Sequence, residues 1–148
     1  MEKNNKRIIL IFVLLFLIGG LSFCTPNIQT TPREQAYLQR ALRTPLQFKV
    51  EKEKDDIVWG RINSWISRFS SMKVQVANDY MIQTYNPVGF LIPKFGYTAS
   101  RIPMGDKTGF EIRCSYSGQF SENTANQNAH ILAHYALTGE VIPKLIFK

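Results

Sequence analysis

In four short segments between residues 72 and 116, apolar side chains recur at every second position, which is the repeat of a half-buried β-strand. Asn78-Asp79 and the stretch 105–109 separate some of these segments and contain residues that tolerate the backbone of tight turns. Strands that are joined by short turns and have one polar face pair in the antiparallel sense. The pattern therefore predicts an antiparallel meander of about four strands, at residues 72–76, 80–85, 97–102 and 110–116.

Two other segments carry the helical repeat. In the first, Val58, Ile62, Trp65, Ile66 and Phe69 form one apolar stripe, and such a stripe is far more often core than a cofactor site. The second helix is expected from about Glu122 to Leu137. Its apolar side is formed by Ala125, Ala129, Leu132, Ala133 and Ala136.

Strands that are flanked by helices, rather than alternating with them, indicate an α+β fold. We therefore predict a two-layer sandwich over residues 46–148, in which the antiparallel meander packs two helices on one face. Alternation in 46–50 predicts a further short strand, and the apolar tail 141–147 is expected to add an edge strand, with Pro143 at a position that only an edge or a bulge tolerates.

Residues 32–45 are expected to form a short peripheral helix before this domain. Thr31 and Glu34 have the spacing of a capping box, and Pro32 suits the first helical position. We favour a helix that lies on its own domain over one that contacts a partner or lipid.

The composition supports a folded chain, because 45% of the residues are hydrophobic. The formal net charge of +7 is spread along the sequence without a block of consecutive basic residues, so nucleic acid is not an expected partner. With two cysteines, Cys24 at the start of the processed chain and Cys114 in the domain, an internal disulfide is not expected.

The N-terminus has the organisation of a secretory signal. Lys3, Lys6 and Arg7 precede an unbroken apolar stretch, Ile8–Ile18, and two glycines follow it. A membrane-spanning helix needs about 20 apolar residues, so a signal peptide over residues 1–23 is favoured over an uncleaved anchor.

Leu21, Ser22 and Cys24 then resemble the lipobox of bacterial lipoproteins, in which an aliphatic residue lies three positions before a cysteine. Phe23 departs from the small residue that is usual there, and this departure is similar to the looser lipoboxes of spirochaetes. The resemblance implies that Cys24 is acylated, that residues 24–31 are a lipidated tether, and that the domain is held at an inner or outer membrane of the cell envelope, outside the cytoplasm. The alternative is ordinary cleavage without a lipid.

Few residues are candidates for catalysis. His130 and His134 lie one helical turn apart, as two metal ligands require, but Ile131 replaces the glutamate of metalloprotease helices and no third ligand is indicated. We place both histidines on a solvated polar face. Cys114 lies on an apolar strand face and is interpreted as a small buried hydrophobe. No cofactor or metal is expected.

The favoured function is therefore a non-catalytic envelope lipoprotein that contacts another protein. The contact is expected at the apolar loop formed by Phe90, Leu91, Ile92 and Phe95, unless the loop folds inward, or at the edge of the last strand.

Two other function classes stay open. The second is a domain that binds a lipid or glycan in a pocket between helix and sheet. The third is an enzyme that uses Cys114 or the pair His130 and His134. The pocket of the second class would be lined by Trp59, Tyr85, Tyr97 and Tyr116.

Overall fold

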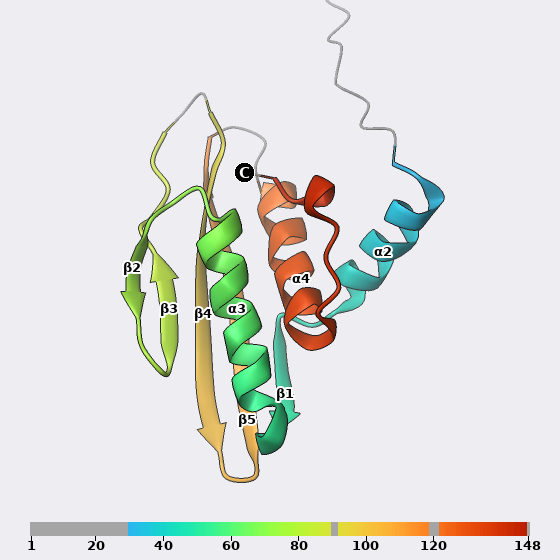
Figure 1. Cartoon of the computed structure of the whole chain (residues 1–148). Helices are drawn as coiled ribbons and strands as arrows, with labels where there is room; N and C mark the ends of the chain where they lie inside the picture. Colours follow the sequence, from blue (N-terminus) through green and yellow to red (C-terminus); the bar gives the residue numbers. More distant parts are fainter. Residues whose placement is uncertain (1–29, 90–91, 119–121, 148) are drawn as a thin grey trace, which may run out of the picture. The chain divides into compact units, whose positions relative to one another are not determined.

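The computed structural model describes residues 30–89, 92–118 and 122–147 (Figure 1). Residues 31–148 form one compact unit, and the whole hydrophobic core cluster comes from it. The predicted signal peptide, Cys24 and most of the tether lie outside the described residues, as do Phe90 and Leu91. None of the described helices is long and apolar enough to cross a membrane.

The first half of the unit begins with helix α2 (Pro32–Arg43), strand β1 (Gln47–Glu51), the 3-10 turn η1 (Lys52–Lys54) and helix α3 (Asp55–Phe69). Strands β2 (Val74–Ala77), β3 (Met81–Thr84), β4 (Lys94–Met104) and β5 (Lys107–Ser117) follow. Helix α4 (Glu122–Thr138) and the 3-10 turn η2 (Pro143–Leu145) end the chain.

The strands form one antiparallel sheet in the order β1-β5-β4-β3-β2, and α3 and α4 cover one of its faces (Figure 1). The predicted α+β sandwich is confirmed. The short strand predicted at 46–50 is confirmed as β1. It pairs with β5 at the edge of the sheet, so the sheet has five strands instead of the four of the meander.

The core lies between this sheet face and the two helices. Trp65 of α3 is fully buried and meets Tyr97 of β4 edge to face, with 4.9 Å between ring centroids. Nearer β1, Phe110 stacks on Phe48 at 5.5 Å and lies 6.3 Å from Trp59. Aromatic side chains therefore fill the space between helix and sheet.

One end of α3 is fixed to the sheet by a buried carboxylate. Asp55 is 1% exposed, and its Oδ1 lies 2.6 Å from Nε of Arg101. Thr108 donates its hydroxyl to Oδ2 at 2.9 Å, and Lys52 Nζ lies 3.4 Å from the same oxygen. Burial would raise the pKa of the Asp55 carboxyl, but the hydrogen bonds from Arg101, Thr108 and Lys52 outweigh it and hold the pKa below its usual value.

A third helix, α2, joins the two that were predicted to pack on the sheet. Helix α2 begins with the predicted capping box, in which Thr31 N–H donates to Glu34 at 2.8 Å and Glu34 N–H donates to Thr31 at 3.3 Å. It packs against α4 and buries Tyr37 and Ala41, so it forms part of the core cluster.

The predicted edge strand at 141–147 was wrong. This tail forms η2 and buries Leu145 and Ile146. Asn128 of α4 donates to Phe147 C=O at 2.9 Å and accepts from Phe147 N–H at 3.1 Å. Because a side chain of α4 satisfies the backbone of the tail, and Pro143 has no N–H to offer, the tail packs on the helix instead of joining the sheet.

Candidate functional site: a groove beside an open strand edge

Strand β5 is paired along its whole length on one side only. Its register with β4 runs from Lys107 to Ser117, whereas its register with β1 stops at Glu111. Figure 1 shows β1 beside only part of the longer β5 strand. Among the described residues, Arg113 to Tyr116 therefore pair with β4, and no strand pairs with them on the β1 side.

The backbone direction of this half follows from the last bond to β1. Ile112 donates its N–H to Leu46 C=O at 2.9 Å, on the β1 side of β5. Backbone groups of successive residues in an antiparallel strand point to opposite sides, so those of Cys114 and Tyr116 point the same way as those of Ile112. Among the described residues, no backbone hydrogen bond reaches them from that side.

The open edge faces a hollow of about 440 Å³ between β5 and the first half of α4. We call it the β5 groove. Its apolar walls come from β5, α4 and the residue before β1, and its polar groups come mainly from the start of α4. It is lined by Leu46, Ile112, Arg113, Cys114, Tyr116, Glu122, Asn123, Ala125, Asn126 and Ala129.

The charged groups at the groove are few and partly paired. Arg113 is exposed and donates its Nε–H to Glu111 Oε1 at 2.8 Å. This bond, together with one from Gln47 at 3.3 Å, lowers the pKa of the Glu111 carboxyl. Glu122 lies at the opposite wall, in the first turn of α4. The groove therefore presents a mixed polar rim around an apolar floor.

Cys114 does not have the environment of a nucleophile. Burial raises the pKa of its thiol to about 12, so the side chain stays neutral at physiological pH. It packs against the core cluster, as the apolar alternation predicted. A neutral thiol adds apolar surface to the groove and supplies no activated sulfur.

The two candidate metal ligands do not lie on a solvated face. His134 is 7% exposed, and its Nδ1 lies 3.2 Å from the Thr44 hydroxyl. His130 Nδ1 lies 2.7 Å from Thr44 C=O. The surface prediction was wrong because α2 and the residue that follows it cover this side of α4. Within the described ranges, no three residues among His, Cys, Asp and Glu are grouped as metal ligands.

The two described residues of the predicted loop patch, Ile92 and Phe95, separate in the structure. Ile92 is 71% exposed, whereas Phe95 is 2% exposed and belongs to the core. The four aromatic residues expected to line a pocket also separate. Trp59 and Tyr97 are buried in the filled core, and Tyr85 and Tyr116 are 51% and 41% exposed.

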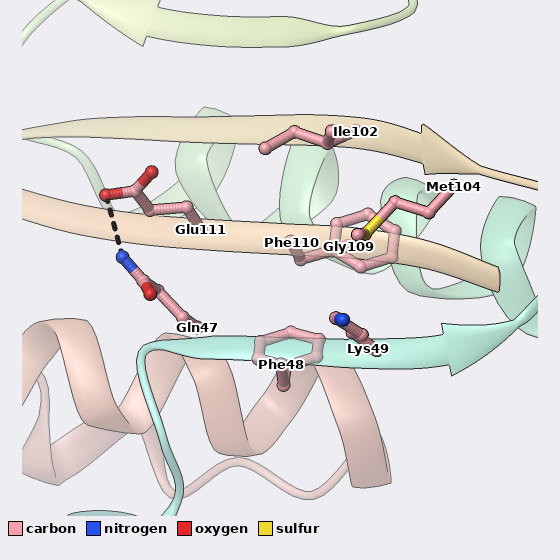
Figure 2. Close-up of a pocket in the computed structure, with 8 residues that line it drawn as sticks. All are labelled: Gln47, Phe48, Lys49, Ile102, Met104, Gly109, Phe110 and Glu111. Atoms are coloured by element: carbon pink, nitrogen blue, oxygen red, sulfur yellow. Dashed lines mark hydrogen bonds between the residues drawn. The ribbon is translucent and has the colours of Figure 1, made fainter.

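A second hollow, of about 340 Å³, lies on the sheet face away from α3 and α4 (Figure 2). We call it the open-face hollow. Figure 2 shows Met104 and Ile102 of β4 on one side and Gln47 and Lys49 of β1 on the other, with Gly109 between them. A Cβ at Gly109 would lie 3.2 Å from Met104 Sδ. The hollow is therefore open at its floor because Gly109 has no side chain.

Comparisons with protein families, with curated proteins and with solved structures find no match to this chain.

The β5 groove was not predicted from the sequence. The strand edge available for pairing was predicted at the C-terminal tail, whereas the open edge belongs to β5, which lies between β1 and β4 in the sheet. One signal was present: the alternation at 46–50 is shorter than the alternating stretch that ends at Tyr116. A short strand cannot pair with the whole length of a longer neighbour. The sequence did not show that these two strands are neighbours, so the open edge could not be predicted from their lengths alone.

Proposed function

We propose that this protein is a non-catalytic lipoprotein of the bacterial envelope, attached through Cys24, whose domain binds an extended segment of another protein in the β5 groove. The observation that carries the proposal is the open half of β5, where the backbone groups of Cys114 and Tyr116 face a groove instead of a neighbouring strand.

An open strand edge selects its occupant by chemistry. It offers alternating N–H and C=O groups, and an extended polypeptide matches that spacing by adding one more strand. The backbone bonds supply affinity that is independent of sequence, and the side chains that enter the groove supply specificity. A peptide segment therefore fits this edge better than a sugar or a lipid does.

The wall opposite the edge limits the size of the occupant. Helix α4 contributes Ala125 and Ala129 across the groove from Ile112, so the added strand lies between a strand and a helix. A second copy of the domain would bring a whole sheet with its edge strand, and α4 occupies that space. We therefore infer a single extended segment with small or medium apolar side chains facing the alanines.

The other two edges are less suited to pairing. The β2 edge is interrupted by a β-bulge between Val74 and Val76, and the β1 edge carries Lys49 and Glu51. Bulges and charges are the features by which sheet edges avoid unwanted strands. Residues 113–117 contain no proline, and their backbone is regular along β4.

The proposal is tested by photo-crosslinking in living cells, with the crosslinking amino acid at Asn126, an exposed residue of the groove. The captured protein is then tested with Tyr116→Pro, which removes one outward N–H, and with Tyr116→Ala, which keeps it. We expect Tyr116→Pro to abolish the crosslink and Tyr116→Ala to retain most of it. A crosslink that survives Tyr116→Pro would exclude strand addition.

Attachment is tested separately, by feeding labelled palmitate to cells that express the full chain or its Cys24→Ala variant. We expect label and membrane retention in the parent chain and neither in the variant. A soluble, unlabelled and cleaved parent chain would exclude the lipoprotein proposal and leave the groove proposal to its own test.

A second candidate function is the binding of a small lipid or glycan in the open-face hollow. Ile102 and Met104, which are 49% and 46% exposed, give this hollow an apolar side beside Lys49. Its test is a thermal shift screen with lipids and glycans. A shift that is reduced by Gly109→Val, which fills the floor, would support it, and no shift across the set would count against it.

A further inference from the structure

We propose that the domain makes a second contact with the membrane, through an anionic lipid surface that binds the end of the sheet where β3 leads into β4. We call this end of the domain the basic apolar tip. It is defined by the residues Arg68, Lys73, Tyr85, Val88, Ile92 and Lys94. The inference depends on the proposed anchor at Cys24 but uses none of the residues of the β5 groove.

The tip exposes large apolar side chains close together in the sequence. Val88 is 70% exposed, Ile92 is 71% exposed, and Tyr85 is 51% exposed at the end of β3. An apolar side chain gains free energy when it leaves water for a lipid interface, and tyrosine favours the level of the headgroups. In the free domain these side chains stay in water and do not gain this free energy.

Hydrogen bonds hold the cations of the tip beside these residues. Tyr85 donates its N–H to Lys73 C=O at 3.0 Å, so Lys73 lies next to the exposed tyrosine. Ser71 donates to Phe95 C=O at 3.3 Å, and this bond brings the end of α3, with exposed Arg68, to the start of β4. Lys94 is the first residue of β4, two positions after Ile92.

Acidic side chains gather at the opposite end of the domain. Asp55 and Asp56 begin α3, Asp106 lies in the turn between β4 and β5, and Asp79 lies in the turn between β2 and β3. Near the tip end, Glu34 is paired with Lys144 at 3.2 Å, and Glu122 is an exposed acid at the start of α4. Cations at that opposite end partly neutralise its acids, because Arg101 contacts Asp55 and Asp56 and Lys107 contacts Glu51. The excess of positive charge therefore lies at the tip.

The domain begins only a few residues after the proposed anchor. Figure 1 shows the start of α2 and the start of β4 at the same end of the domain. Thr31 lies seven residues after Cys24, and a chain of that length spans at most about 25 Å. An acylated Cys24 would hold the start of α2 within this distance of the lipid, and electrostatic attraction between the tip and the lipid would act within about a Debye length, roughly 10 Å.

The test measures flotation of the mature chain, residues 24–148 with Cys24→Ser, so that no acyl chain contributes. The vesicles contain phosphatidylcholine alone or mixed with phosphatidylglycerol. We expect binding only to the anionic vesicles and weaker binding as salt is raised. Lys73→Ala and Lys94→Ala should each weaken binding about fivefold. The control Lys54→Ala makes the same charge change at the opposite end and should have no effect.

Apolar insertion has its own matched pair. Val88→Ser combined with Ile92→Ser should weaken binding to the anionic vesicles further, whereas Ile57→Ser, at a residue 57% exposed in the first turn of α3, should not. Absence of binding to anionic vesicles, or equal losses for Lys54→Ala and Lys73→Ala, would overturn the inference. Because the chain tested carries no lipid, these outcomes are independent of whether Cys24 is acylated in cells.

Discussion

The two halves of strand β5 belong to one continuous strand but differ in their pairing with neighbouring strands. Residues 107–111 lie between β1 and β4, and Phe110 is 2% exposed. Of the described strands, β4 alone pairs with Arg113 to Tyr116, and Tyr116 is 41% exposed. The first half is therefore fixed between two strands, whereas the second half has one edge that faces the β5 groove.

The comparison shows how a small domain combines a stable sheet with an unsaturated edge. Thr108, in the paired half, is bonded to the buried Asp55 of α3 at 2.9 Å, so helix and strand hold each other. The open half is held by its register with β4 and by the core packing of Cys114. Function is expected where the backbone has spare hydrogen-bonding capacity, and stability where it has none.

The largest expected contrast comes from truncating one aromatic residue in each half. Phe110→Ala removes a buried ring that packs on Phe48 and Trp59, and it should lower the free energy of unfolding by about 3–5 kcal/mol. Tyr116→Ala should lower it by about 1 kcal/mol or less, because the ring is largely in solvent. Chemical denaturation measures both, and equal losses would contradict the distinction between the halves.

The link between the paired half and α3 is tested by Asp55→Asn. The substitution leaves Arg101, 15% exposed at its side chain, without its buried partner, and it should cost about 3 kcal/mol of unfolding free energy. Asp56→Asn is the matched control, because Asp56 contacts the same arginine at 2.7 Å but is 92% exposed. Its expected cost is below about 1 kcal/mol.

The same carboxylate predicts the direction of the acid response. Its pKa is lower in the folded chain than in the unfolded chain, so its stabilisation is fully present above the unfolded pKa of about 4 and is lost as the pH falls through the folded value. Unfolding free energy measured between neutral and acidic pH should therefore decline less steeply in Asp55→Asn. Identical slopes in the two chains would show that Asp55 is not the responsible group.

The smallest expected effect concerns Cys114, in the open half. Cys114→Ala should lower the unfolding free energy by less than about 1 kcal/mol, because it removes one small and only partly buried group. Because the thiol pKa is about 12, alkylation of the folded parent chain at pH 8 should be far slower than alkylation of the unfolded chain. Rapid alkylation of the folded chain would return Cys114 to the candidates for a nucleophile.

Sequence patterns predicted the α+β sandwich because each element satisfies a local rule. The stripe of α3 that includes Val58 and Trp65, the alanine side of α4 and the capping box of Thr31 are decided by residues within a few turns of one another. The strands at 81–84 and 107–117 follow the same logic, because their alternation is visible without knowledge of their partners.

What the sequence could not show depends on contacts between distant residues. The clamp of Asn128 on Phe147, the cover that α2 places over His134, and the end of β1 beside Glu111 are all set by tertiary packing. The candidate site is of this kind, because the groove exists only where a short strand stops beside a longer one. Cys114 and Tyr116 were visible as an alternating pair, but the direction of their backbone groups was not.

The most direct test of the account is amide hydrogen exchange along β5, residue by residue, in the free chain and with the protein captured at Asn126. The account predicts slow exchange at Phe110 and Ile112 in both states, fast exchange at Cys114 and Tyr116 in the free chain, and strong protection of those two amides on binding. Protection of Cys114 and Tyr116 in the free chain that does not change on binding would mean that the edge is already covered, and would contradict the account.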